Sequence, residues 1–330
     1  MKHARLALAR DAELLPQLTD SIGVFGQMDE ERLRGMDDLD LVCESSSFVT
    51  STAMNAAGFR VAPEQSGPFK HAIVFLPRAK AEAHHLIAKA IGLVPNGWII
   101  VDGQKTDGIE SIAKQVGKVV PHLASYSKAH GKTIWFRAED ALALKEWHAE
   151  PGQIDGGFET RPGVFSADGV DPASALLLGL LPNDLKGEAV DLGSGWGFLS
   201  AGLLERAPMI SRVHLVEDNA NAQNCARSNV KDERAEFHWN DALRWRAKDL
   251  VQTVVMNPPF HTARDATPAL GIEFIKAAAR MLKPSGKLYM VANAHLPYEP
   301  TLEQFFSKTE LLERTSRFKV FYAERGRGKV

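Results

Sequence analysis

A glycine-rich turn between an apolar segment and a helical pattern is the first feature of the sequence that could do chemistry. The apolar run that ends at Asp191 is followed by a turn of small residues: Gly193, Ser194, Gly195 and Gly197. Glycines let the backbone approach a ligand closely, and the start of a helix offers free N–H groups to a negative or polar group. The pattern predicts a strand, a ligand-binding turn and a helix, although nicotinamide and flavin enzymes use the same pattern and some such turns bind nothing.

A proline-rich segment supplies a second candidate site directly after the apolar residues 253–256: Asn257, Pro258, Pro259 and Phe260. The prolines prevent the strand from continuing, and Pro258 favours an extended conformation at Asn257. The amide oxygen of Asn257 and the carbonyl of Pro258 are two acceptors beside an aromatic ring. A planar substrate that carries an amine needs this set, but an isolated motif of this kind is equally compatible with a turn that buries Phe260.

Acidic and amide residues follow two further strand-like segments. Glu217 and Asp218 come after residues 213–216, and Asn240 and Asp241 follow the next expected strand. In a doubly wound sheet, ligands bind outside the carboxyl ends of the strands. Glu217 lies about 20 residues past the glycine-rich turn, where a carboxylate can hold ribose hydroxyls, although each of these residues taken alone could be a solvated strand end.

The first half of the chain repeats the order of strands and helices found in the second half. After apolar runs at 22–25 and 39–43, the first half has a run at 71–79, the helix 81–91, a break at Pro95, Asn96 and Gly97, and runs at 98–101 and 132–138. The second half has a run at 253–261, the helix 272–282, a break at Pro284, Ser285 and Gly286, and runs at 288–291 and 318–324, at similar spacing. We therefore predict two copies of one α/β unit. Chance similarity between two α/β units is the alternative interpretation. The first copy has GVFGQMDEERL in place of a glycine-rich turn and Phe75 to Arg78 in place of the proline motif, so it has lost its site.

Residues 139–163 are polar and rich in proline and glycine, as a linker or a short hairpin would be. We place the domain boundary near residue 150, which gives domains 1–150 and 151–330. A surface hairpin of the second domain is the alternative interpretation.

Composition limits the classes of protein that this chain can belong to. A formal net charge of −2 argues against a protein-wide nucleic-acid surface, so any RNA contact must be local. Cys43 and Cys225 lack the companions that a zinc site or a disulfide framework needs. No apolar run approaches the roughly 20 residues of a membrane span, and Asp11 and Glu13 interrupt the region that a signal peptide would need. We expect a cytoplasmic protein.

Longer segments carry a family resemblance: RPGVFSADGVDPASALLLGLLP at 161–182, NPPFH at 257–261, VANAHLPY at 291–298 and RFKVFYA at 317–323. Together with the D-x-G-x-G-x-G turn, they resemble the class I S-adenosylmethionine-dependent methyltransferases, and in particular the ribosomal RNA guanine-N2 methyltransferases of the RsmC/RlmG type. In that family an acidic-Gly pair usually follows the NPPFH motif, whereas Thr262, Ala263 and Arg264 follow it here. The departure bears on the substrate more than on the reaction.

The resemblance implies two tandem Rossmann-like methyltransferase domains, each a mostly parallel seven-stranded sheet with helices on both faces, the first degenerate. It implies S-adenosylmethionine as cofactor, S-adenosylhomocysteine as product, no metal, and methyl transfer to the N2 amine of a guanine in ribosomal RNA, with small-subunit RNA expected. The catalytic set would be Asn257, Pro258, Pro259 and Phe260. The cofactor would be held by Asp191, Gly193, Ser194, Gly195, Gly197, Glu217, Asp218, Asn240, Asp241 and Asn257.

Other functions remain open at this stage. Adenine-N6 and protein-glutamine methyltransferases use similar proline shelves, and a nicotinamide-dependent oxidoreductase or a nucleotide-binding regulator could share the turn. We expect ribosomal RNA or a ribosomal subunit as the partner, no membrane, and a monomer. For the first domain we expect a role in binding RNA or substrate, or a structural one.

Overall fold

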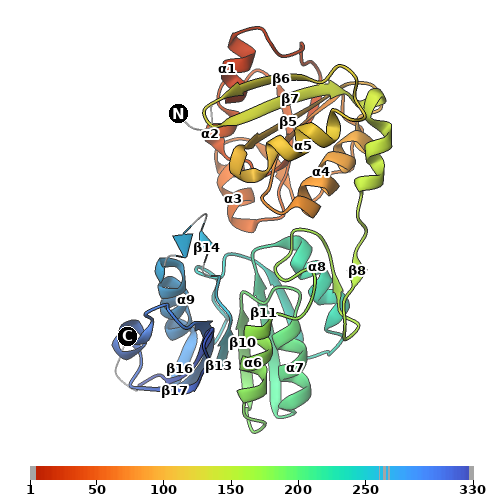
Figure 1. Cartoon of the computed structure of the whole chain (residues 1–330). Coiled ribbons are helices and arrows are strands. Elements are labelled where there is room, and N and C mark those ends of the chain that lie inside the picture. The colour runs from red at the N-terminus through yellow and green to blue at the C-terminus, as the bar shows by residue number, and fades with distance from the viewer. Residues whose placement is uncertain (1–4, 260, 263–264, 267, 327–330) are drawn as a thin grey trace. The chain divides into compact units, whose positions relative to one another are not determined.

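The computed structural model describes residues 5–259, 261–262, 265–266 and 268–326. The chain forms two compact units, Met1–Pro151 and Gly152–Val330 (Figure 1). Within the described residues, no helix has both the length and the apolar character needed to cross a membrane.

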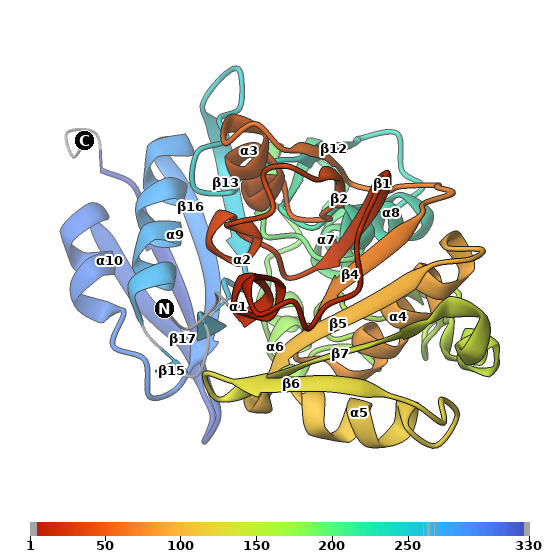
Figure 2. The same cartoon turned by 90° about the horizontal axis from the view of Figure 1, so that it is seen from above.

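The first unit is built on a seven-stranded sheet with the order β3-β2-β1-β4-β5-β7-β6. Figure 2 shows strands β1, β4, β5, β7 and β6 following one another in this order. All neighbours are parallel except that β7 runs antiparallel to β5 and β6. The strands are β1 (Ser21–Gly26), β2 (Asp40–Glu44), β3 (Arg60–Ala62), β4 (His71–Phe75), β5 (Trp98–Gln104), β6 (Ala124–Lys128) and β7 (Gly131–Arg137).

Helices cover both faces of this sheet and create two cores. Ile87 and Ile112 belong to the core on one face, and Leu33 and Met54 to the core on the other. Because both faces are buried, β4 is apolar along nearly its whole length, as the parallel strands of such folds are. The helices are α1 (Arg5–Asp11), α2 (Glu30–Leu33), α3 (Phe48–Ala56), α4 (Lys80–Leu93), η1 (Lys105–Asp107), α5 (Ile109–Val116) and η2 (Ala138–Trp147).

The second unit repeats the same topology with a sheet of order β12-β11-β10-β13-β16-β18-β17. Strand β18 runs antiparallel to β16 and β17, and the other neighbours are parallel. The strands of this unit are β8 (Gly152–Gln153), β9 (Glu159–Thr160), β10 (Gly187–Leu192), β11 (Ile210–Glu217), β12 (Ala235–Trp239), β13 (Val251–Met256), β14 (His261–Thr262), β15 (Asp265–Ala266), β16 (Leu282–Asn293), β17 (Lys308–Arg314) and β18 (Phe318–Glu324). The pairs β8–β9 and β14–β15 form small separate hairpins.

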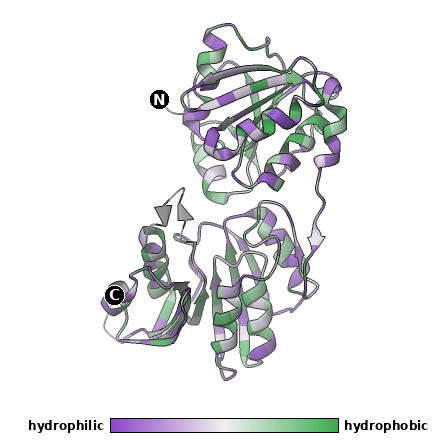
Figure 3. Cartoon of the chain, in the orientation of Figure 1, coloured by the Kyte–Doolittle hydropathy of each residue, from purple (hydrophilic) through white to green (hydrophobic). Residues whose placement is uncertain are grey.

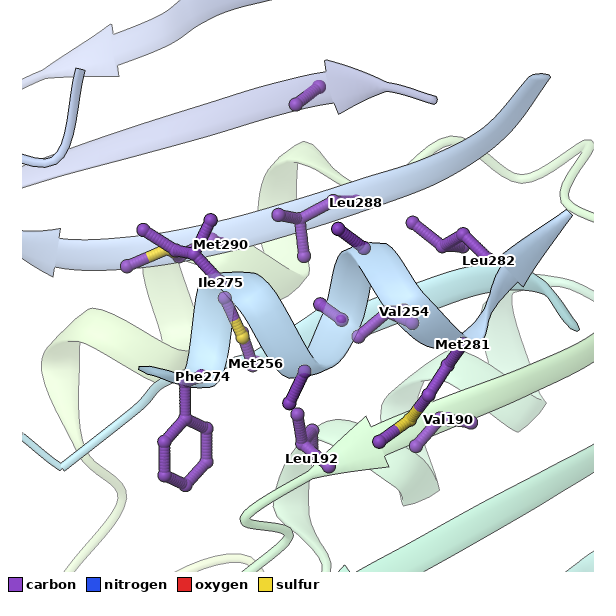
Figure 4. Packing of buried hydrophobic residues seen from close by; sticks show 14 of the residues in the cluster. Val190, Leu192, Val254, Met256, Phe274, Ile275, Met281, Leu282, Leu288 and Met290 are labelled. Carbon is purple, nitrogen blue, oxygen red and sulfur yellow. The ribbon is translucent and has the colours of Figure 1, made fainter. Parts of the chain in front are cut away.

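The core of the second unit also lies on both faces of its sheet. On one face, α9 places Phe274 and Ile275 against Val254 and Met290 of the central strands (Figure 4). Other helices cover the opposite face, where Leu203 is fully buried. Figure 3 shows hydrophobic and hydrophilic stretches alternating along these helices, as expected of helices with one buried face. The helices are α6 (Pro172–Leu180), α7 (Phe198–Arg206), α8 (Ala220–Asn229), α9 (Pro268–Met281) and α10 (Glu299–Phe305).

The predicted fold class is confirmed: both units are mostly parallel seven-stranded sheets of one topology. The predicted break at Pro284, Ser285 and Gly286 is wrong as an interruption between helix and strand, because β16 already begins at Leu282. Residues 284–286 lie within this long strand and make it irregular. Ser285 has a φ of 64°, and the pairing of β16 with β13 shifts register there.

Much of the predicted linker is ordered structure. Residues 138–147 form η2, which consists of two short 3₁₀ segments joined by a kink at Ala141. Ala141 and Leu144 are buried and join the core of the first unit. Only the following hairpin β8–β9 fits the description of a short hairpin.

Candidate active site

The carboxyl ends of four neighbouring parallel strands place the predicted polar residues along one edge of the second sheet. In the order β12-β11-β10-β13, Asp241 follows the first of these strands, Glu217 ends the second, Asp191 is the penultimate residue of the third, and Asn257 follows the fourth. Parallel neighbours end on the same side of a sheet, so residues scattered over 67 positions of the sequence meet at one edge.

The glycine-rich turn leaves an open space at its centre. Gly193, Gly195 and Gly197 all have positive φ values, of 79°, 55° and 91°. A Cβ atom added at Gly195 would meet nothing within 4 Å, whereas one added at Gly197 would lie 2.9 Å from Val230. The turn is fixed by the N–H groups of Gly193 and Ser194, which donate to the carbonyl of Val216 at 2.9 and 3.1 Å. The backbone is therefore held in place while the side at Gly195 remains free for a ligand.

Asp191 lies at the base of this turn and is fully buried. Its Oδ2 atom accepts a hydrogen bond from the Ser200 hydroxyl at 2.7 Å, but its Oδ1 atom is buried without a partner. Burial, opposed by the Ser200 hydrogen bond and reinforced by the charge of Glu217, raises the pKa of Asp191 to about 7. The Ser194 hydroxyl is likewise buried without a partner. Native proteins rarely leave such atoms unpaired, which indicates that a polar ligand group completes them.

Glu217 closes the other side of the turn. Its two carboxylate oxygens accept the N–H groups of Gly195 and Asn219, both at 2.8 Å. Burial raises the pKa of Glu217, although these two hydrogen bonds act in the opposite direction. Each carboxylate oxygen has a second lone pair, so both can still accept from ligand hydroxyls.

The remaining predicted cofactor residues belong to the turns that follow β11 and β12. They are Asp218, Asn240 and Asp241. The Asp218 carbonyl accepts from the Trp239 indole N–H at 2.7 Å, and the Asn240 N–H donates to the Glu217 carbonyl at 3.0 Å. Asp241 uses Oδ1 to accept the Leu243 N–H at 2.8 Å, which fixes the turn after β12. One oxygen of Asp241 is thus committed to the fold.

Asn257 is held by two side chains at the start of α6. Its Nδ2 atom donates to Asp171 Oδ2 at 2.8 Å and to Ser174 Oγ at 2.9 Å, and its Oδ1 atom is buried without a partner. Pro258 is buried and Pro259 is exposed. Phe260, the fourth member of the predicted catalytic set, lies outside the described residues.

Three residues at the site were given no role by the sequence analysis. Asp171 and Ser174 were quoted only within a family segment, although Asp-Pro before an apolar run is a typical start of a helix. Trp196, between two glycines of the turn, donates its indole N–H to the Phe165 carbonyl at 3.0 Å and packs against Phe158 with ring centroids 5.2 Å apart. It ties the preceding loop to the turn.

A cluster of potential metal ligands occupies the sheet near its β12 edge. His214, Glu236 and His238 place ligand atoms within 4.8 Å of one another. His214 Nδ1 and His238 Nε2 are 3.1 Å apart, and Arg212 pairs with Glu236 at 2.9 Å. These contacts satisfy the three side chains as a hydrogen-bonded network.

The corresponding strand ends of the first unit lack the polar residues of the site. Strand β4 of the first unit occupies the place of β13 in the sheet order. Leu76, which is fully buried, follows β4 where Asn257 follows β13. An apolar residue therefore takes the position of Asn257 in the first unit.

Comparisons with known proteins cover both units. Residues 155–322 match the methyltransferase small domain, and residues 43–150 match the N-terminal methyltransferase small domain. Ribosomal RNA small subunit methyltransferase C of Salmonella newport is 32% identical over 258 residues, which cover 76% of this chain and 74% of that protein, and the same values hold for the Salmonella typhi protein. A T. thermophilus 16S rRNA N2 G1207 methyltransferase, solved with AdoMet and guanosine, aligns with a TM-score of 0.79 at 22% identity over 95% of this chain and 90% of that one.

Proposed function

This chain belongs to the methyltransferase small domain family, and we propose that it transfers a methyl group from S-adenosylmethionine to the N2 amine of a guanine in small-subunit ribosomal RNA. The observation that carries the proposal is the buried, unpartnered Oδ1 atom of Asn257 beside an open glycine-rich turn. The relatives named for small-subunit RNA methylation and the fold shared with a guanine-N2 methyltransferase support the choice of substrate.

The residues around the turn fit S-adenosylmethionine. The unpartnered Asp191 Oδ1 and Ser194 Oγ atoms offer a buried anion and a hydroxyl to the methionine portion, and the open side of Gly195 leaves room for it. Glu217 would accept from the ribose hydroxyls, with Asp218 beside it, and Asn240 and Asp241 would border the adenine. All of these residues come from one unit of one chain, so the proposal needs no second copy.

The chemistry requires alignment more than acid or base groups. When bound, S-adenosylmethionine supplies a methyl group that its sulfonium already activates. Asn257 Oδ1 and the Pro258 carbonyl would accept the hydrogens of the guanine amine, which directs the nitrogen lone pair and stabilises the positive charge that grows on nitrogen. We propose that Pro259 stiffens this shelf and that Phe260 stacks on the base.

Methyl transfer from labelled S-adenosylmethionine tests the proposed function. The substrates are naked ribosomal RNA and small and large subunits that lack guanine-N2 methylation, and the label is located by nucleoside analysis. We expect N2-methylguanosine in small-subunit RNA. Label in N6-methyladenosine or in protein glutamine would overturn the substrate class and keep the cofactor.

Cofactor affinity should depend on pH through Asp191. Because its pKa is raised to about 7 by burial, the carboxyl is largely protonated below that pH. A cationic ligand favours the ionised form, so S-adenosylmethionine should bind about 10-fold more tightly at pH 7.5 than at pH 5.5. Calorimetric titration across this pH range measures how the dissociation constant of S-adenosylmethionine changes with pH. The Asp191→Asn variant should bind with little pH dependence, and an equal rise in that variant would rule out Asp191 as the titrating group.

We propose that the first unit holds RNA, because it retains the fold without the polar residues of the site. Residues 152–330 alone should then bind ribosomal RNA about 10-fold more weakly than the full chain, since one of two binding modules is lost. Filter binding on both proteins measures the difference. An unchanged RNA affinity in a soluble product would leave the first unit with a structural role only.

A further inference from the structure

Two side chains at the start of α6 fix the orientation of the Asn257 amide. We propose that Asp171 and Ser174 are positioning residues for methyl transfer, because they hold Asn257 with its carbonyl oxygen directed away from them and available to the substrate amine. The contacts that carry this inference are the hydrogen bonds from Nδ2 to Asp171 Oδ2 at 2.8 Å and to Ser174 Oγ at 2.9 Å. The inference rests on the proposed function and assigns roles to residues outside the proline motif.

The chemistry of the partners excludes the opposite orientation of the amide. An amide nitrogen carries two hydrogens and a carboxylate has none to give. If the amide were flipped, Oδ1 would face the Asp171 carboxylate, and repulsion would replace the 2.8 Å hydrogen bond. In the observed orientation both amide hydrogens have acceptors, and only Oδ1 is left buried and unpaired. The unpaired atom is thus the acceptor that the substrate amine requires.

Asp171 also affects the strength of the acceptor. A negative group that accepts from Nδ2 polarises the amide and increases the electron density on Oδ1, as hydrogen bonds in a chain strengthen one another. The amine nitrogen becomes positive as the methyl bond forms, and a polarised acceptor stabilises that charge more than the neutral amine. The contribution of Asp171 should therefore appear in the rate of methyl transfer rather than in cofactor binding.

The local sequence explains how one helical turn supplies both contacts. Asp171 is the N-cap of α6 and accepts the Ser174 N–H at 2.8 Å, with Pro172 at the first helical position. Ser174 is the third helical residue, so its hydroxyl lies beside the capping carboxylate. Removing Asp171 would also remove the N-cap of α6, and an experiment must separate this effect from positioning.

A double-mutant cycle makes that separation. Asp171→Asn and Ser174→Ala are each made in the wild-type chain and in an Asn257→Ala chain, and single-turnover methyl transfer to small subunits lacking guanine-N2 methylation is measured alongside S-adenosylmethionine affinity. In the wild-type background we expect rates about 10- to 100-fold lower for Asp171→Asn and about 3- to 10-fold lower for Ser174→Ala, with cofactor affinity retained. In the Asn257→Ala background neither change should slow the reaction further.

Matched controls come from the first unit. Asp29 caps α2 by accepting the Arg32 N–H at 2.8 Å, and Ser51 is a buried serine of α3. Asp29→Asn and Ser51→Ala should leave the rate unchanged.

If each substitution slows methyl transfer by the same factor in both backgrounds, Asp171 and Ser174 act through the stability of the fold. If neither substitution changes the rate in the wild-type background, the two residues do not position Asn257. Either result overturns the inference. If Asp171→Asn fails to bind cofactor, Ser174→Ala, which keeps the helix cap, decides the question. A wild-type chain that methylates no guanine would instead overturn the proposed function itself.

Discussion

Replacing Asn257 with alanine is expected to slow methyl transfer to small-subunit RNA about 10²- to 10³-fold, the loss seen when one preorganised hydrogen-bonding group is removed from a reaction centre. The amide oxygen of Asn257 is the buried acceptor without a partner, and alanine has no atom to replace it. Single-turnover assays with saturating S-adenosylmethionine measure the loss. Cofactor affinity should change by less than about threefold, since the interaction is strongest as charge develops on the amine.

Asn55→Ala is the control for this prediction. Asn55 also uses its side-chain amide, accepting the Val61 N–H at 3.3 Å, but it lies in α3 of the first unit. Its replacement should leave the rate of methyl transfer unchanged. A rate for Asn257→Ala within about threefold of wild type would contradict the assigned role, because a group that stabilises developing charge cannot be removed at so little cost.

Replacing Gly195 with alanine is expected to weaken S-adenosylmethionine binding about 100-fold, or about 2.7 kcal/mol, which lies within the range of about 1–3 kcal/mol for overpacking a site. The added methyl group would enter the open space at the turn, where it meets no protein atom within 4 Å. We infer that the cofactor uses this space. Calorimetric titration at one pH gives the dissociation constants of the variant and the wild type.

Gly58 provides the comparison for Gly195. It too has a positive φ, of 91°, and a Cβ atom added there would meet nothing within 4 Å, but it lies in the first unit. Gly58→Ala carries similar backbone strain and should leave cofactor affinity unchanged. Equal affinity for Gly195→Ala and wild type would mean that the cofactor does not occupy the turn.

Local pattern was enough to predict the fold. Runs such as His71–Phe75 and Phe318–Glu324 are apolar and bounded by breaking residues, and the structure has strands there. The duplication was visible because both halves keep the same order of breaks. The end of α9 was predicted to within one residue, but the break expected after it was wrong, since the strand β16 starts directly at Leu282 and contains residues 284–286 as an irregularity. The start of such a strand depends on its pairing with neighbouring strands, and the sequence of the segment alone does not specify that pairing.

The candidate site was predictable only where it follows strand order. Residues at strand ends, such as Asp191 and Glu217, could be grouped because parallel strands end at one edge. The partners of Asn257 could not be found this way. Asp171 and Ser174 belong to a helix, and their direction toward the proline motif depends on how that helix packs on the sheet.

The link between Asn257 and Asp171 joins residues 86 positions apart in the sequence. No local segment can form it, because α6 must first pack on a sheet whose strands β10 to β13 are already paired. Catalytic competence is therefore a cooperative property of the whole second unit and vanishes with any opening that separates α6 from β13. Methyl transfer thus reports native tertiary structure more strictly than helix or strand content, which a partly folded chain can retain.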